Sequence, residues 1–240
     1  METLQNKNVV IAGATGGIGA ALARLVKNSR AHVHLTGRDA AALSALAGEL
    51  GLGADRAHAL DVTDHAAVLR VAGEIEAATG EQGVDILVNA TGIGIIKPLD
   101  ALSYEDFSRT IDVNLKGAFS LLQGFVPAMK ARKSGLIINL PGVLGKTPMA
   151  GAAAYAASKY GLNGMLKSVR EELRRTRVRI TNLYLGGTDT GFWDEIDLKV
   201  QRDKFVTAEE AARAVWFLCQ QPDSGVVSEM VLQPFNHQAI

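Results

Sequence analysis

The sequence predicts an α/β fold in which a mainly parallel sheet carries helices on both faces. Two observations lead to this class. Short runs rich in Val, Ile and Leu alternate with longer segments of helical periodicity along the chain. Several of the short runs are almost continuously apolar, which is typical of strands covered on both faces, and repeated strand–helix alternation favours parallel pairing. Because the chain has no internal repeat or linker-like stretch, we expect one domain, 1–240.

Seven strands and six helical segments follow from these patterns. The strands are expected at 8–12, 32–36, 56–60, 85–89, 135–140, 178–185 and 226–232. The helical segments are expected at 17–28, 39–50, 64–80, 103–132, 151–176 and 207–221. Four of these segments begin with a residue that can cap the first helical turn: Asp39, Asp64, Ser103 and Thr207. An acidic residue follows each of the last two caps by three positions, Asp106 and Glu210, as in a capping box.

Charge and cysteine content exclude several classes of partner. The 25 basic and 25 acidic side chains give a formal net charge of zero, so no overall field attracts nucleic acid or an anionic membrane. The one cysteine, Cys219, rules out a disulfide framework within the chain and fits a reducing compartment. The polar start METLQNKN lacks the apolar core of a secretory signal, and no apolar run is long enough to span a bilayer. We therefore expect a cytoplasmic protein. We also expect no metal site, because the five histidines do not have the spacing of metal ligands.

The turn after the first strand is rich in glycine. Gly13, Gly17 and Gly19 stand between the expected strand and the expected helix. Glycines let backbone amides approach phosphate oxygens closely, and the helix N-terminus adds unpaired N–H donors and a favourable dipole. Such turns also serve packing between helix and strand, but the position at the first β-α junction favours dinucleotide binding.

The end of the second strand bears on the choice of dinucleotide. An acidic residue there accepts hydrogen bonds from a ribose 2′-hydroxyl and repels a 2′-phosphate. This chain has Gly37 and Arg38 instead, which leave room for a phosphate and supply a guanidinium. The alternative is an exposed loop arginine without a ligand. Asp39 is better suited to cap the next helix, so we expect NADP(H) rather than NAD(H).

Tyr155 and Lys159 lie one helical turn apart in the segment 151–176. A free phenol has a pKa of about 10, and a neighbouring ammonium favours the phenolate. We therefore expect a proton-transfer pair in which the tyrosine pKa is lowered. The spacing alone occurs often in helices by chance, so its weight comes from the motifs around it.

Six motifs stand in one order along the chain. They are GATGGIG (13–19), DVTD (61–64), NATG (89–92), DVNLKG (112–117), YAASK (155–159) and GGTDT (186–190). In this order and spacing they resemble the motifs of the short-chain dehydrogenase/reductase family, and the likeness runs nearly from end to end. The resemblance implies a Rossmann-type, doubly wound, mainly parallel sheet of seven strands. It also implies hydride transfer between a nicotinamide and the carbonyl or hydroxyl carbon of a small-molecule substrate.

The resemblance assigns residues to both halves of the cofactor. In the glycine-rich turn, the implied contacts are Gly13, Thr15, Gly17, Ile18 and Gly19. On the adenosine side, they are Asp61, Val62, Asn89, Ala90 and Gly92. Thr188 and Thr190 match positions that hold the nicotinamide carboxamide, with turn formation as the alternative role. Lys159 matches the residue that also binds the nicotinamide ribose.

The implied general acid/base is Tyr155, assisted by Lys159 and Asn114. Asn114 matches the residue that orders a water in the family's proton relay; its alternative role is to satisfy a helix kink. The family serine that orients the substrate carbonyl is replaced here by Gly142. Losing one such donor commonly lowers the rate about 10²–10³-fold.

Three interpretations of Gly142 stay open. The chain is a reductase in which another group replaces the serine, or it is a catalytically weak or inactive NADP(H)-binding sensor or partner subunit. Alternatively, the glycine is an isolated substitution in an ordinary enzyme, which the unusual neighbour Pro141 disfavours.

Two further expectations concern the surroundings of the site. The polar, irregular segment 191–205 is a candidate lid, and its Phe192 and Trp193 suggest a partly apolar substrate. The family resemblance implies a homodimer or homotetramer that packs through its long helices.

Overall fold

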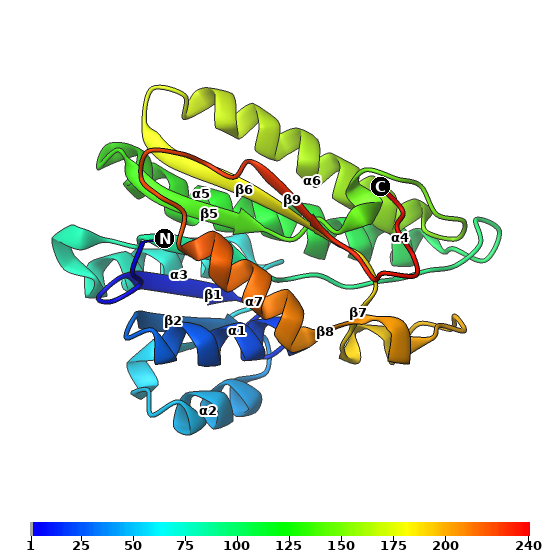
Figure 1. Cartoon of the computed structure of the whole chain (residues 1–240), viewed down its shortest axis with the longest axis horizontal. Helices are drawn as coiled ribbons and strands as arrows, with labels where there is room; N and C mark the ends of the chain where they lie inside the picture. Colours follow the sequence, from blue (N-terminus) through cyan, green and yellow to red (C-terminus); the bar gives the residue numbers. More distant parts are fainter. Residues whose placement is uncertain (1) are drawn as a thin grey trace.

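A parallel sheet of seven strands forms the centre of the protein, as seen in a computed structural model that describes residues 2–240 (Figure 1). The strand order is β3-β2-β1-β4-β5-β6-β9, and every neighbouring pair is parallel. The strands are β1 (Asn8–Ala12), β2 (His32–Gly37), β3 (Ala57–Ala59), β4 (Ile86–Asn89), β5 (Ser134–Asn139), β6 (Arg177–Leu185) and β9 (Glu229–Leu232). The predicted Rossmann-type, doubly wound sheet is therefore confirmed.

Helices cover both faces of this sheet (Figure 1). One face carries α1 (Gly17–Asn28), α2 (Ala40–Glu49) and α7 (Ala208–Cys219). The other carries α3 (His65–Ala78), α5 (Gly117–Ala131) and α6 (Ala153–Glu172), with α4 (Tyr104–Ile111) packed beside α6. The four predicted caps all accept a hydrogen bond from the first turn of their helix. Only Thr207 and Glu210 complete a capping box, because the Asp106 carboxylate pairs with Lys97 instead.

The strand side chains divide between two hydrophobic cores. Val9 and Ile11 of β1 face the core under α1 and α7, whereas Val10 faces the core under α3 and α5. This alternation follows from the two-residue period of a strand. Since both faces are covered, the strands read as continuous apolar runs, which is the pattern that predicted them.

The predicted helical segment over 103–132 is helical from Tyr104 to Ala131 but changes type in its middle. A π-helix, Asp112–Lys116, separates α4 from α5. Its residue Asn114 is buried, and the side-chain amide bonds to both main-chain polar groups of Ile93. These tertiary hydrogen bonds offset the poor helix propensity of asparagine at this point and hold the widened turn.

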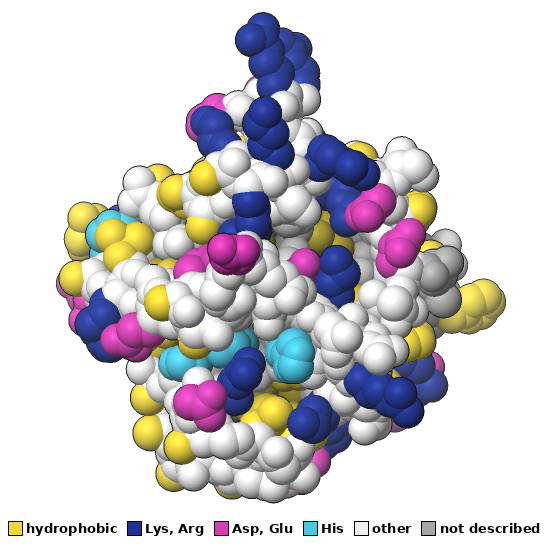
Figure 2. Space-filling model, turned by 90° about the vertical axis from the view of Figure 1, so that its left-hand side faces the viewer, with side chains coloured by type: hydrophobic (Ala, Val, Ile, Leu, Met, Phe, Trp, Pro, Cys, Tyr) yellow, Lys and Arg dark blue, Asp and Glu magenta, His cyan; other side chains and the backbone are white. Residues whose placement is uncertain are grey.

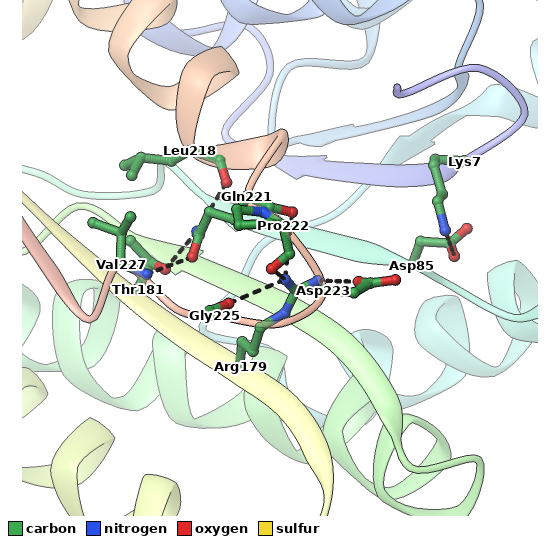
Figure 3. A network of polar contacts seen from close by, with 10 residues as sticks. All are labelled: Lys7, Asp85, Arg179, Thr181, Leu218, Gln221, Pro222, Asp223, Gly225 and Val227. Carbon is green, nitrogen blue, oxygen red and sulfur yellow. Dashed lines mark hydrogen bonds and ion pairs between the residues drawn. The ribbon is translucent and has the colours of Figure 1, made fainter. Parts of the chain in front are cut away.

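The loop that leads into β9 is held by side chains from the first half of β6 (Figure 3). The Arg179 guanidinium donates to the carbonyl of Pro222 at 2.8 Å and pairs with Asp223. The Gln221 amide donates to Thr181 and accepts from the Val227 N–H. Because this N–H is used by the loop, β9 begins at Glu229 rather than at 226.

The amino ends of the strands form a face that carries side chains of both charge signs (Figure 2). The carboxyl ends lie on the opposite side, where the short strands β7 (Thr188–Asp189) and β8 (Val206–Thr207) pair in parallel. The two paired strands lie just before and after the candidate lid, 191–205, in the sequence. Across residues 2–240, we find no helix with both the length and the apolar character needed to cross a bilayer.

Candidate active site

The glycine-rich turn lies where the strand order reverses, between β1 and β4. Gly13 has φ +81°, and a Cβ atom on it would lie 2.8 Å from the carbonyl oxygen of Ala90. A Cβ on Gly19 would lie 2.2 Å from the Gly13 carbonyl oxygen. Only glycine therefore allows this turn to pack against β4 and to start α1 at Gly17. A switch point of this kind, opening on a helix N-terminus, fits the pyrophosphate of a dinucleotide.

One cavity of about 900 Å³ extends from this turn to the first turn of α6. It brings together ten of the expected site residues: Thr15, Gly17, Ile18, Gly19, Ala90, Gly92, Tyr155, Lys159, Thr188 and Thr190. The other expected residues lie outside its lining: Gly13, Arg38, Asp61, Val62, Asn89 and Asn114. The cavity thus corresponds to the pyrophosphate and nicotinamide half of a dinucleotide and includes Ala90 and Gly92, whereas the expected adenosine contacts Asp61, Val62 and Asn89 lie outside its lining.

The expected adenosine end is an open surface beside β2 and β3. A Cβ on Gly37 would lie 3.2 Å from Thr15 Oγ1, so the turn and the β2 end are in close contact. Arg38 is exposed and makes none of the hydrogen bonds or ion pairs found among residues 2–240. Asp61 Oδ1 accepts from both the N–H and the hydroxyl of Thr63, and the N–H holds the pKa of that carboxyl below its ordinary value. The guanidinium is therefore available for a phosphate, and the second Asp61 oxygen for a donor on a base.

Tyr155 and Lys159 project from α6 into the far end of the cavity. Lys159 Nζ lies 5.3 Å from the centroid of the Tyr155 ring. Lys159 is only 3% exposed, and burial lowers the pKa of its ammonium to about 8. Burial also raises the pKa of the Tyr155 phenol. The predicted lowering of the tyrosine pKa is therefore wrong for the cofactor-free protein, because burial disfavours the charged phenolate.

Asn114 fastens the loop after β4 to α6. Its amide nitrogen donates to the Ile93 carbonyl and to Ser158 Oγ, and its Oδ1 accepts from the Ile93 N–H at 2.9 Å. Ser158 in turn donates to the Tyr155 carbonyl at 2.7 Å. A Cβ on Gly92 would lie 3.3 Å from both Asn114 Oδ1 and Lys159 Nζ, so the three residues converge. The amide has no N–H left for a water, whereas Oδ1 keeps one lone pair.

Gly142 lies directly beside the tyrosine hydroxyl. A Cβ on it would lie 3.7 Å from Tyr155 Oη, close enough for a serine hydroxyl to reach the phenol. Its backbone has φ +69° and ψ 165°, a region that is essentially restricted to glycine. The loop at this point therefore differs from a serine-bearing loop in conformation as well as in side chain.

Two parts of the cavity wall were missed by sequence reasoning as site residues. The ring of Phe192 packs edge-on against Tyr155, with centroids 5.8 Å apart. His237 and Ala239 also line the cavity, although they lie near the end of the chain. Phe192 was predicted only as part of a lid; no motif marked the C-terminal pair, because its position depends on the Gln233 amide, which bonds to the main chain of Ala239 and Ile240.

The fold and the site together define a class of protein. A phosphate cradle at the switch point of a doubly wound sheet shares one cavity with a phenol and a buried ammonium, which is the arrangement of a nucleotide-dependent oxidoreductase. Among residues 2–240, no three His, Cys, Asp or Glu side chains are placed to hold a metal ion.

Comparison with known proteins identifies the family. Residues 7–201 match the family described as short chain dehydrogenase, and the chain belongs to this family. An uncharacterized oxidoreductase of Staphylococcus epidermidis is 31% identical over 235 residues, which cover 98% of this chain and 100% of the relative.

Solved structures agree with this assignment. An alcohol dehydrogenase from the archaeon Thermococcus sibiricus, complexed with 5-hydroxy-NADP, superposes with a TM-score of 0.87 at 28% identity, covering 98% of this chain and 99% of the other. A metagenomic short-chain oxidoreductase in complex with NADP gives a TM-score of 0.81 at 36% identity, covering 97% and 99%.

Proposed function

We propose that this protein is an NADP(H)-dependent carbonyl reductase or alcohol dehydrogenase in which Tyr155 is the general acid/base. The observation that carries the proposal is the shared cavity. The Tyr155 phenol, the Lys159 ammonium and the glycine cradle all line it. A cofactor seated on the cradle supplies hydride to the carbonyl carbon of the substrate.

The chain's own residues then hold and move a proton. Because burial raises the Tyr155 pKa, the phenol stays protonated near neutral pH, which is the form that donates to a carbonyl oxygen. Lys159 provides a buried positive charge that favours the phenolate left after donation. Asn114 acts through position, since its amide ties Ile93 to Ser158 and so to the first turn of α6.

Arg38 supports NADP(H) over NAD(H). Its guanidinium is exposed, unpaired among the described residues and placed at the end of β2, beside the glycine turn. A 2′-phosphate on the adenosine ribose would meet this charge, while the nearby carboxylates already accept other hydrogen bonds: Asp39 caps α2 and Asp61 accepts from Thr63. The NADP and 5-hydroxy-NADP complexes of the two solved relatives agree with this choice.

The second candidate is a weak or inactive NADP(H)-binding protein. The Gly142 position favours it, because no hydroxyl there orients a substrate oxygen. Retention of the phenol favours the reductase, since a pure binder needs only the cradle and the lysine.

We also propose that the protein is cytoplasmic and forms a homodimer or homotetramer. Light scattering measures the oligomeric state.

The two candidates are separated by turnover. NADPH oxidation is measured with a panel of ketones, aldehydes and quinones, while NADPH binding is followed by fluorescence. We expect binding and measurable turnover of at least one compound, slower with NADH. Binding without turnover of any compound would establish the second candidate instead.

A further inference from the structure

Besides Ile96, three segments outside the cofactor motifs contribute to the cavity lining. The loop after β5 contributes Val143, Leu144, Thr147, Pro148 and Met149. The candidate lid contributes Phe192, Trp193, Leu198, Val200 and Phe205. The C-terminal segment contributes His237 and Ala239. Along residues 2–240, no Asp, Glu or Arg side chain lines the cavity, and Lys159 is its only lysine.

This distribution of charge restricts the substrate. A carboxylate or phosphate taken into such a cavity needs a cation or several N–H donors, and an unpaired buried charge is strongly disfavoured. Lys159 already serves the phenol, and its ammonium is itself destabilised by burial. No carboxylate among the described residues of the lining awaits a substrate ammonium either. Away from the N–H groups of the glycine turn, the His237 imidazole is the one other side chain of the described lining that could pair with an anion, so the lining favours an uncharged compound.

An aromatic wall stands next to the proton donor. Phe192 packs edge-on against Tyr155, and Trp193 packs edge-on against Phe192 at 5.4 Å. Trp193 also contacts the Phe205 ring at 5.2 Å, and its Nε1 donates to the Thr188 carbonyl. The wall is thereby fixed to β7, which lies on the nicotinamide side of the cavity.

The place of Phe192 depends on Gly94. A Cβ on Gly94 would lie 2.2 Å from the Phe192 Cζ atom, so the ring occupies the space that a side chain at 94 would fill. Gly94 does not have a positive φ, so alanine there adds no backbone strain. Substitution of Gly94 by alanine therefore tests the contact with the Phe192 ring without straining the backbone.

Resting on the proposed reductase function, we propose that the cavity selects an uncharged carbonyl compound whose apolar ring packs on Phe192, and that the Gly94–Phe192 contact positions this ring. A substrate ring that packs on Phe192 meets an aromatic side chain beside the Tyr155 phenol. When both rings are aromatic, the contact contributes more binding free energy than the buried area alone. Thr147 and His237 are the polar side chains that the loop after β5 and the C-terminal segment contribute, and most of the other residues from these segments and the candidate lid are apolar.

Two matched substrate pairs test the proposal. Ethyl benzoylformate and benzoylformate share the reacting ketone and differ in charge, whereas ethyl benzoylformate and ethyl pyruvate differ in phenyl against methyl. We expect kcat/KM for the neutral ester to exceed that for the acid about 100-fold or more. We expect the phenyl ester to exceed the methyl ester about 10–100-fold.

Four variants locate the selection. Phe192→Ala should remove most of the phenyl preference, and Gly94→Ala should do the same by displacing the ring. In a Phe192→Ala background, Gly94→Ala should change nothing further. Phe217→Ala, an exposed phenylalanine on α7, is the matched control and should keep the preference. Equal kcat/KM for ester and acid, or a phenyl preference that survives Phe192→Ala, would overturn the proposal.

Binding separates this proposal from the proposed function. Calorimetry of both phenyl compounds on the NADP+-loaded protein gives their affinities without any reaction. If the ester binds and the acid does not, while no compound of the ketone, aldehyde and quinone panel is turned over with NADPH, the reductase function fails and the selection stands. If both bind equally, the selection fails whatever the turnover.

Discussion

Gly142 combines a missing side chain with an unusual backbone. Its backbone angles are φ +69° and ψ 165°, a conformation that costs residues other than glycine about 1–3 kcal/mol of folding free energy. Its carbonyl accepts from the Gly145 N–H, which closes the turn after β5. A serine at position 142 would therefore supply a hydroxyl but strain the backbone of this turn.

Gly142→Ser and Gly142→Ala test that conflict together. Both should lower the free energy of unfolding by about 1–2 kcal/mol, because both add a Cβ at positive φ. Only the serine places a hydroxyl near Tyr155 Oη, so its kcat should exceed that of the alanine variant about 10-fold or more. Thermal unfolding and NADPH turnover supply the two readouts. Equal stability of both variants with the parent would show that the turn is not strained by a side chain.

Burial of Lys159 predicts how stability depends on pH. The unfolded lysine binds a proton up to its ordinary pKa of 10.5, whereas the folded one loses it above about 8. Between these values the unfolded chain holds more protons, so stability rises with pH, by at most about 1.4 kcal/mol per unit. Above pH 10 the raised Tyr155 pKa acts in the opposite direction.

Urea unfolding of the cofactor-free protein at pH 8 and pH 10 measures this rise. Lys159→Met should abolish the lysine's share of it, whereas Lys167→Met, an exposed lysine of the same helix, should leave the rise intact. An identical pH dependence in parent and Lys159→Met would mean that the ammonium is hydrated in the folded state.

The proximity of Tyr155 and Lys159 could be predicted, because helical spacing alone sets it. The direction of the tyrosine pKa could not. That direction depends on burial of the phenol, and one residue packed against its ring is Phe192, which comes from a segment far along the chain and packs where Gly94 leaves space. Local sequence spacing carries no information on such a contact.

At the level of elements, the candidate lid is held by one arginine. The Arg202 guanidinium donates to the Asp189 and Asp194 carboxylates at 2.5 and 2.6 Å and to the Thr190 carbonyl at 2.9 Å. These ion pairs are exposed, and single exposed pairs contribute about 0–1 kcal/mol. Acting together, they join both ends of the segment that carries Phe192.

Arg202→Gln should therefore loosen the lid and leave the rest of the fold intact. We expect limited proteolysis to cut within 191–205 several-fold faster, with the midpoint of thermal unfolding changed by no more than about 2 °C. Arg24→Gln is the matched control, since Arg24 makes a two-pronged exposed pair with Glu49 on another part of the surface. Equal cleavage of the parent and Arg202→Gln would contradict the tethering role.

Most elements could be predicted from hydrophobic period and capping residues, as the confirmed caps at Asp39 and Thr207 show. The π-helix at Asp112–Lys116 could not, because it depends on hydrogen bonds from Asn114 to a loop distant in sequence. Likewise, the start of β9 is set by the Gln221 side chain rather than by the apolar run itself.

For the whole molecule, the sheet order places the glycine turn and the end of β4 at one switch point. A ligand bound there stabilises the folded state as a unit. NADP+ at about 100 times its Kd should add about 2.7 kcal/mol, which raises the unfolding midpoint by about 5–10 °C.

Arg38→Ala should reduce this thermal shift with NADP+ and leave the smaller shift with NAD+ unchanged. Arg70→Ala removes an exposed arginine of α3 and should alter neither shift. Equal shifts with both cofactors in the parent would contradict the proposed preference for NADP(H).

A single-turnover experiment shows whether Tyr155 donates the proton in a working reductase. NADPH-loaded protein is mixed with a ketone that the parent reduces, and loss of NADPH is followed in time. We expect Tyr155→Phe to slow this step about 10²–10⁴-fold while NADPH affinity stays within about twofold, because the ring remains and only the hydroxyl is lost. An unchanged rate in Tyr155→Phe would contradict this role.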